Sequence, residues 1–122
     1  MESQGSIQVD DHGDVAVVSL IGDHDIVTAA SVRQVLAAQA ASSNGVVVSL
    51  METTFFDSGI VRVLFATDKA LRERDGRLVL HVATASIVAR VLAVSGLSQR
   101  IVCTASLDQA VLLAAICPTE TG

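Results

Sequence analysis

"GVVVSLMETTFFDSGIVRVLF", residues 45–65, joins two apolar segments of different periodicity through an acid, a hydroxyl and a glycine. The run at 46–53 is almost entirely apolar and rich in valine, which is typical of a central strand covered on at least one face. After Asp57, Ser58 and Gly59, apolar residues recur at helical spacing. The stretch therefore predicts a buried strand followed at once by a helix.

The rest of the chain repeats this alternation of strand and helix. Strands are predicted at 7–9, 15–22, 46–53, 77–82 and 100–103, and helices between residues 23 and 42 and at 61–74, 84–96 and 106–116. Gly13 lies in a turn that allows the first two strands to pair as a hairpin. The order ββαβαβαβα predicts an α/β fold in which the later strands run parallel.

Length and composition limit the class of protein. The chain has 122 residues, of which 51% are hydrophobic and 2% aromatic, without Trp or Tyr. One domain with a core of valine, leucine, isoleucine and alanine is expected. We expect this domain at 7–116, with a flexible N-terminus at 1–6 and a flexible tail at 117–122. The sequence has no apolar run of the ~18 residues that a membrane helix needs, and its start lacks the features of a signal peptide, so a cytoplasmic protein is expected.

Charge and cysteine content disfavour several kinds of site. The net charge of −5 argues against direct binding to nucleic acid, where a basic face supplies the affinity. Cys103 and Cys117 form no C-x-x-C pair and have no histidine cluster beside them, so a metal site is not expected. We interpret both as buried thiols rather than a redox pair. No cofactor and no membrane partner are predicted.

Capping residues predict where helices begin and end. The candidate signals are Thr84 as an N-cap, Gly96 and Gly76 as C-terminal glycines, and Ser106 with Gln109 as a capping box. Within the helix at 61–74, Asp68 and Arg72 have the spacing of an i, i+4 ion pair.

Two loops at the carboxyl ends of predicted strands carry acids. One contains Asp23 and Asp25, and the other contains Asp57. Ligand and signalling sites of parallel α/β folds collect at this edge of the sheet. One hypothesis is a carboxylate cluster for acid–base catalysis or Mg²⁺ with His24 beside it, although no nucleophile elbow or phosphate-binding glycine motif accompanies it. The simpler interpretation makes Ser58 a helix N-cap, Asp57 a partner of the helix dipole and His24 a partly exposed side chain.

A family resemblance runs through the same residues. Residues 45–97, with "GVVVSL" before the aromatic-Asp-Ser element, "RVLFATDKALRERDGRLVL" and "VARVLAVSGL", resemble the core of a STAS domain and in particular a bacterial anti-sigma factor antagonist. Upstream, "GDHDIVTA" is similar to the Gly-acid-x-Asp-x-x-Thr-Ala loop of that family. The similarity covers roughly 7–116. It implies one α/β domain with a mixed sheet, an initial hairpin, and helices mainly on one face.

The resemblance implies a regulatory switch rather than an enzyme. In the family, a Ser or Thr directly after the Asp is phosphorylated by the anti-sigma factor, which is a serine kinase of the histidine-kinase-like ATPase type. The position here is Ser58. The unphosphorylated antagonist binds the anti-sigma factor and frees the sigma factor, phosphorylation ends that complex, and a phosphatase resets it. Asp25, Thr28 and Asp57 match the two loops of the family.

The expected binding face surrounds this serine. The partner is expected to contact 22–28, 55–60 and the outer side of the helix at 61–74. Asp23 and Gly59 lie in those loops, and Arg62 lies one turn into the helix on its polar side, where an arginine suits a protein interface. Phe55 and Phe56 are expected to end the third strand, with at least one of them packed inward.

The junction departs from the family pattern at one point. Antagonists usually carry Asp-Ser-(Ser/Thr/Ala)-Gly-Leu, whereas this chain has Asp57-Ser58-Gly59-Ile60-Val61, with the glycine one position early. Gly59 is expected to tighten the turn and leave the Ser58 hydroxyl exposed. Two alternatives stay open. One is a STAS module of another signalling or lipid-transport assembly that is not phosphorylated, and the other is a small acid-dependent enzyme.

Overall fold

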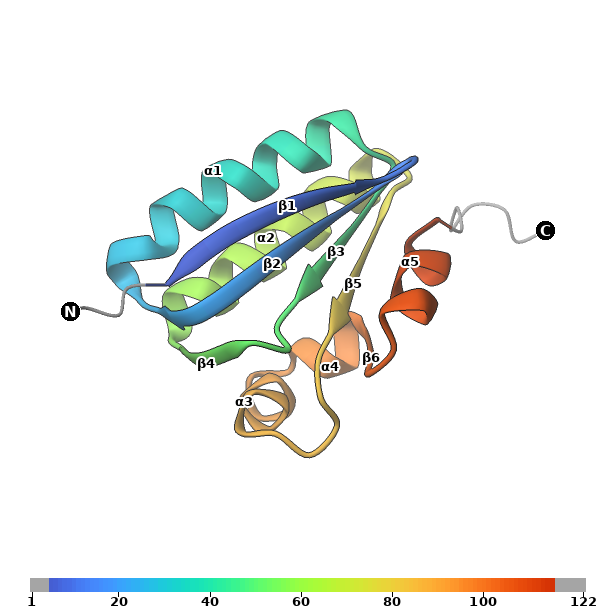
Figure 1. The fold of residues 1–122 in the computed structure, drawn as a ribbon. Helices are drawn as coiled ribbons and strands as arrows, with labels where there is room; N and C mark the ends of the chain where they lie inside the picture. The colour runs from blue at the N-terminus through green and yellow to red at the C-terminus, as the bar shows by residue number, and fades with distance from the viewer. Residues whose placement is uncertain (1–4, 116–122) are drawn as a thin grey trace.

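The fold is built around a six-stranded mixed sheet. The computed structural model describes residues 5–115. The strands are β1 (Ser6–His12), β2 (Val15–His24), β3 (Gly45–Ser49), β4 (Thr53–Phe56), β5 (Arg77–His81) and β6 (Val102–Thr104). Their order in the sheet is β1-β2-β3-β5-β6, and β4 pairs with β2 (Figure 1).

The sheet begins with an antiparallel hairpin and continues with parallel strands. Ser6 of β1 pairs with Ile21 of β2, and His12 pairs with Val15. Gly13 in the turn has a φ of 72°, a left-handed value that glycine adopts without strain. The pairs β2–β3, β3–β5 and β5–β6 are all parallel. The predicted α/β fold with an initial hairpin is therefore confirmed.

Helices cover both faces of the sheet unequally. Residues 5–115 form α1 (Ile26–Ser42), α2 (Ser58–Glu73), α3 (Ile87–Ser95), α4 (Leu97–Arg100) and α5 (Leu107–Ala115). α1 and α2 lie against one face and α5 against the other, so helices lie mainly on one face, as expected (Figure 1). Within 5–115, none of these helices combines the length and the apolar character needed to cross a membrane.

Alternating side chains of the valine-rich strands fill two separate cores. The larger core holds the even-numbered strand positions Val18, Leu20, Val46, Val48, Leu78 and Leu80, with Val32 and Leu36 of α1 and Leu64 and Leu71 of α2. The smaller core packs Val15, Val17, Val47 and Val79 against Ala110 and Ala114 of α5. Because both faces of the central strands are covered, their sequences are continuous apolar runs rather than alternating ones.

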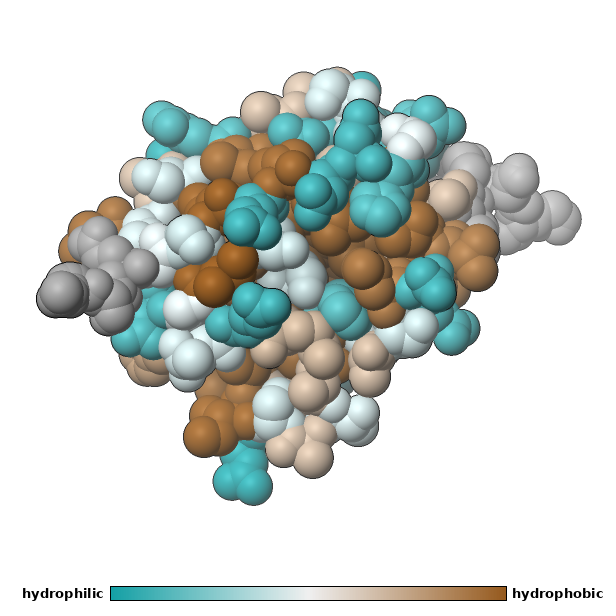
Figure 2. Space-filling view, viewed as in Figure 1, coloured by the Kyte–Doolittle hydropathy of each residue, from teal (hydrophilic) through white to brown (hydrophobic). Residues whose placement is uncertain are grey.

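α5 lies close to the sheet but leaves apolar surface beside it. A Cβ at Gly45 would overlap the carbonyl oxygen of Ala114, so only glycine allows the end of α5 to approach the start of β3 this closely. Leu112 on the outer side of α5 is 67% exposed. Figure 2 shows hydrophobic surface over α5 and the neighbouring strands in this view.

The predicted strand at 46–53 is wrong at its carboxyl end. The chain leaves the ladder after Ser49, and Thr53–Phe56 form the separate strand β4. Phe55 and Phe56 consequently end β4 rather than the third strand. β4 pairs in parallel with the last residues of β2, not with β3.

Local hydrogen bonds fix the position of β4 against β2. The Gly22 amide donates to the Glu52 carbonyl over 2.9 Å. The Thr53 hydroxyl, which is buried, donates to the Leu20 carbonyl. Gly22 has a φ of 85°, and the register between the two strands shifts between Gly22 and Asp23. The glycine thus allows the bulge that moves the end of β2 from β3 to β4.

α3 begins later than the sequence predicts. Its first residue is Ile87, and the hydroxyl of Ser86 accepts a hydrogen bond from the Ala89 amide at 3.0 Å. The same hydroxyl donates to the Ala83 carbonyl at 2.9 Å. Ser86 is therefore the N-cap and the prediction of Thr84 is wrong, because a turn at 83–86 precedes the helix.

The two predicted C-terminal glycines differ in role. Gly96 ends α3 with a φ of 88°, which confirms it as the stop signal. After α2 the left-handed residue is Asp75, with a φ of 64°, so the C′ prediction for Gly76 is wrong by one position. Gly76 serves a close approach instead: a Cβ there would lie 2.5 Å from the carbonyl oxygen of Asn44.

The elements that follow α3 are only partly predicted from the sequence. The Gln109 amide donates to the Ser106 hydroxyl at 3.2 Å, so that half of the predicted capping box is present. The short helix Leu97–Arg100 was not predicted. It occupies the start of the strand expected at 100–103, and the observed strand is Val102–Thr104.

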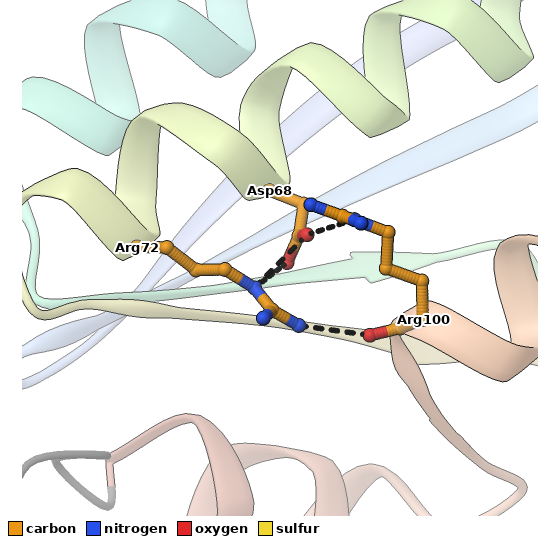
Figure 3. Close-up of polar contacts among 3 residues, drawn as sticks. All are labelled: Asp68, Arg72 and Arg100. Atoms are coloured by element: carbon orange, nitrogen blue, oxygen red, sulfur yellow. Dashed lines mark hydrogen bonds and ion pairs between the residues drawn. The ribbon is translucent and has the colours of Figure 1, made fainter.

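Asp68 ties α2 to α4 (Figure 3). Its carboxylate is 3.1 Å from Nε of Arg72, which confirms the predicted i, i+4 pair, and 3.3 Å from Nε of Arg100. The Arg72 guanidinium also donates to the Arg100 carbonyl at 2.9 Å. The Asp68 side chain is 3% exposed, whereas both arginines are about half exposed. The buried carboxylate on the inner side of α2 is thus paired with two arginines, which offsets the cost of burying its charge.

Candidate functional site

The pairing of β2 with β4 brings the two acidic loops together. His24 and Phe56 are paired residues of this parallel ladder. The residues that follow them, Asp25 and Asp57, leave the same edge of the sheet and begin α1 and α2. Figure 1 shows these helices running alongside each other from that edge. The two acidic loops therefore lie side by side, although Asp57 follows β4 rather than the third strand as expected.

Asp25 caps α1 through a complete capping box. Its side-chain oxygen accepts a hydrogen bond from the Val27 amide at 2.9 Å. The Thr28 hydroxyl in turn accepts a hydrogen bond from the Asp25 amide at 3.2 Å. The two residues that match the family loop thus satisfy backbone donors at the start of α1.

Asp57, rather than Ser58, caps α2. The Asp57 backbone is extended, and its side-chain oxygen accepts a hydrogen bond from the Gly59 amide at 2.9 Å. Ser58 is the first helical residue. The interpretation of Ser58 as the N-cap is wrong by one position. The capping function therefore belongs to the aspartate, and the serine hydroxyl is not needed for it.

Gly59 has a helical position and no left-handed φ, so the prediction that it tightens the turn is wrong. Its lack of a side chain serves close packing instead. A Cβ there would lie 3.2 Å from the Asp57 carboxylate and 3.6 Å from Cβ of Ala29 in α1. The glycine thus leaves room for the capping carboxylate of Asp57, whereas the contact with Ala29 would be an ordinary one.

The Ser58 side chain is available at the surface. The residue is exposed, and its hydroxyl makes no hydrogen bond to the described part of the chain. Of the two preceding aromatics, Phe56 is buried and Phe55 is 53% exposed, which confirms that at least one packs inward. Arg62, one turn later, is also exposed. An accessible hydroxyl thus follows a turn that a buried phenylalanine anchors.

His24 is fully buried, which overturns its expected partial exposure. Its Nε2 lies 3.2 Å from the carbonyl oxygens of Ser6 and Ile21, and its Nδ1 lies 3.1 Å from the Thr28 hydroxyl. Carbonyl oxygens only accept, so Nε2 carries a proton. The side chain connects β1, β2 and α1 directly beneath the loop.

The acids of the loops are each engaged locally. Asp23 is exposed and accepts a hydrogen bond from the Thr54 hydroxyl of β4. Asp25 and Asp57 are both used as helix caps. Among residues 5–115, no group of three or more His, Cys, Asp or Glu side chains is arranged to hold a metal ion. This geometry favours positioning of the two helices over acid–base chemistry.

The comparison with protein families agrees with this geometry. The family model described as "Mlab, STAS domain" matches residues 7–109. The chain belongs to the STAS domain family.

Solved structures of anti-sigma factor antagonists have a similar fold to this STAS domain. The antagonist from Mycobacterium paratuberculosis is 28% identical with a TM-score of 0.81, and the match covers 93% of this chain and 96% of that one. A putative antagonist from Thermotoga maritima, 15% identical, has a TM-score of 0.80 and covers 90% and 95%. The phosphorylated Bacillus cell fate determinant SpoIIAA, 20% identical, has a TM-score of 0.70 and covers 88% and 98%. No curated protein matches the sequence at a significant level. At 15% and 20% identity, the Thermotoga and Bacillus structures show a similar fold alone.

Within residues 5–115 the STAS domain has one cysteine, which lies in β6. Cys103 is a free cysteine, partly buried, and its Sγ lies 3.5 Å from the Ile101 carbonyl oxygen. Burial raises the pKa of the Cys103 thiol above its ordinary value. Cys117, the second predicted buried thiol, lies outside the described residues.

A second polar cluster of the STAS domain was not predicted from the sequence. Ser19, Ser49 and His81 are paired neighbours across β2, β3 and β5, and the Ser49 hydroxyl lies 2.9 Å from Nδ1 of His81. They line a pocket of about 240 Å³ on the same face as α5. The signal was present in the sequence, because the valine runs of β2 and β3 are both interrupted by serine at the same register.

Proposed function

We propose that this STAS domain is a phosphorylation-controlled antagonist of an anti-sigma factor and acts in the cytoplasm. The observation that carries the proposal is the exposed Ser58 directly after the N-cap Asp57, beside the Asp25–Thr28 loop, in a chain 28% identical to an anti-sigma factor antagonist. The unphosphorylated domain binds an anti-sigma factor that is also a serine kinase, which frees the sigma factor for transcription. Phosphorylation of Ser58 ends the complex, and a phosphatase restores it.

The switch works by changing charge rather than by unfolding. A phosphate adds about −1.5 to −2 charges at Ser58, beside Asp57. The start of α2 tolerates this group because its free amides and the helix dipole favour a negative charge. A partner carboxylate docked ~5 Å away would be repelled by roughly 3 kcal/mol per unit charge at an effective dielectric of about 20, and less in salt. Loss of 2 to 4 kcal/mol, on the order of a hundredfold in affinity, would dissociate a micromolar complex.

Phosphorylation is tested first. The purified protein is incubated with ATP and each histidine-kinase-like ATPase encoded in the same genome, and its intact mass is measured. One of these kinases should add a single phosphate to the native protein and to Ser31→Ala, which removes another exposed serine. Ser58→Ala should gain none. A phosphate that appears equally on Ser58→Ala would disprove the assignment of the site.

Binding is tested next by calorimetry against the kinase found in that experiment. Ser58→Ala should bind like the unphosphorylated native protein and stay bound after ATP is added. Ser58→Glu should bind about a hundredfold more weakly while its circular dichroism spectrum stays native. The proposal is wrong if Ser58→Glu binds with native affinity and no kinase phosphorylates Ser58.

A second candidate function is a STAS module of an assembly that does not use phosphorylation. Two observations favour it: the family model carries the description Mlab, and Gly59-Ile60 departs from the usual antagonist pattern. In that case Ser58→Ala and Ser58→Glu would bind the partner equally, and no kinase would modify the native protein.

A further inference from the structure

α3 presents an apolar stripe to solvent next to the start of α2. Ile87, Val91 and Val94 lie at i, i+4 and i+7 of this short helix, on one side of it. Ile87 is 78% exposed and Val94 is 84% exposed, the highest values among the large hydrophobic residues described. Two such residues on one helical stripe mark a surface that is suited to a partner.

Two residues of the stripe, Val91 and Val94, line a groove that Ser58 lines from the other side. The groove has a volume of about 370 Å³. Its lining includes Phe56, Ser58 and Val61 on the side of α2, and Arg90, Val91 and Val94 on the side of α3. The lining is thus mostly apolar, and it includes Ser58 from α2 and Arg90 from α3. Ser95 of α3 also lines it, but its hydroxyl donates to the Leu92 carbonyl.

Arg90 is the charged group of this groove that has no internal partner. Its side chain makes no hydrogen bond or ion pair within residues 5–115, while its backbone amide donates to the Ser86 carbonyl within α3. Arg72 and Arg100, by contrast, share the carboxylate of Asp68. Asp57 also lines the groove, but its carboxylate caps α2 by accepting from the Gly59 amide. The groove therefore combines a mostly apolar lining with a cation that is free to pair with an incoming acid.

We propose that the α2–α3 groove receives a protein segment that carries an apolar side chain next to a carboxylate, with the carboxylate paired to Arg90. The complementarity of an unpaired guanidinium beside a mostly apolar lining selects this partner over a basic one. A phosphate on Ser58, which rests on the proposed function, takes Arg90 instead, because guanidinium pairs with phosphate in a bidentate geometry. Phosphorylation then removes the cation that the partner needs, in addition to placing negative charge at the edge of the groove.

The pairing within the protein is tested without any kinase. Phosphoserine is incorporated at position 58 by genetic code expansion, and the second ionisation of its phosphate is followed by ³¹P NMR as a function of pH. Arg90→Ala should raise that pKa by about 0.5 relative to the native protein, the size of an exposed ion pair worth roughly 0.7 kcal/mol. Arg33→Ala, which removes an exposed arginine of α1, should leave it unchanged. An unchanged pKa in Arg90→Ala, or a larger shift in Arg62→Ala, would overturn the assignment of Arg90.

The docking surface is tested with unphosphorylated protein and the kinase identified above. Val94→Asp and Arg90→Glu should each weaken binding at least tenfold, whereas Leu112→Asp, an equally polar change on exposed α5, should not. If neither groove variant changes the affinity, the groove is not the docking surface. Because the NMR experiment needs no partner, absence of any binding kinase would defeat the proposed function and leave the Arg90 result to be judged by itself.

Discussion

Asp25 and Asp57 cap two neighbouring helices with the same bond: each side chain accepts an amide two residues ahead at 2.9 Å. They follow His24 and Phe56, which are paired across the parallel strands β2 and β4. The starts of α1 and α2 thus use the same kind of capping hydrogen bond, and the pairing of β2 with β4 places them side by side. Ser58 differs from this framework because it is exposed and takes no part in the capping bonds.

The first prediction separates the cap of α2 from the serine beside it. Asp57→Ala should lower the free energy of unfolding by about 1 kcal/mol, because a backbone amide loses its acceptor. Asp57→Asn keeps an acceptor oxygen and should cost only a few tenths of that value. Asp25→Ala should match Asp57→Ala, and Ser58→Ala should be neutral. Urea unfolding followed by circular dichroism gives all four values. Destabilisation by Ser58→Ala as large as by Asp57→Ala would contradict the assignment of the cap.

The second prediction concerns the buried carboxylate of α2. Asp68→Ala should destabilise the protein by about 1.5 to 3 kcal/mol, since charge-assisted hydrogen bonds to a buried group are lost. Arg72→Ala and Arg100→Ala should each cost less, because both guanidinium groups are half exposed and each variant leaves the other pair intact. Glu73→Ala, an exposed acid on the same helix, is the matched control. Equal midpoints of urea unfolding for Asp68→Ala and Glu73→Ala would show that the pairs add nothing.

Much of the fold follows from periodicity in the sequence. The valine runs identify the central strands because side chains on both faces of those strands are buried. The presence of acids at the carboxyl edge of the sheet also follows, since parallel strands end at one edge of the sheet. Asp68 and Arg72 are found because helical spacing alone brings them together. In each case the decisive contact is local or is dictated by strand direction.

Features that depend on distant backbone are not found in this way. β4 exists because Gly22 allows a bulge and Glu52 supplies a carbonyl 30 residues along the chain. His24 is buried beneath β1, where the Ser6 carbonyl accepts a hydrogen bond from its Nε2. Arg90 and Ser58 line one groove only because α3 lies beside the start of α2. No pattern within a short window of sequence carries these relationships.

The third prediction concerns the reactivity of Cys103, measured in a Cys117→Ser variant so that one thiol remains. Burial raises the pKa of Cys103, so its thiolate fraction at a given pH is smaller in the folded protein than in the unfolded chain. Alkylation by iodoacetamide at pH 8 should therefore be slower in buffer than in urea. The stabilising effect of the protonated thiol is fully present below the pKa of the unfolded thiol and is lost as pH rises through the folded value. Equal alkylation rates in both conditions would contradict this environment.

The fourth prediction concerns the packing of α5 on the sheet. Gly45→Ala should cost about 1 to 3 kcal/mol, because its Cβ would collide with the Ala114 carbonyl oxygen and push the end of α5 away. Asn44→Ala changes an exposed neighbour and should have little effect. Native-state hydrogen exchange should show faster exchange in α5 for the glycine variant, with α1 unchanged. Exchange that increases equally in α1 would mean that the whole domain, rather than this contact, is weakened.

The last prediction concerns Arg62, which is exposed one turn after Ser58. If the partner covers the loops and the outer side of α2, a charge reversal there should repel the partner's acidic groups and slow association. Arg62→Glu should weaken binding to the kinase about tenfold, and the loss should shrink as salt is added, because screening acts on exposed charges. Arg33→Glu makes the same charge reversal on α1, outside the two loops, and should bind normally. Both variants should melt at the native temperature, since neither arginine has an ion pair within residues 5–115. Native affinity of Arg62→Glu at low salt would place the partner on the α3 side of Ser58 alone.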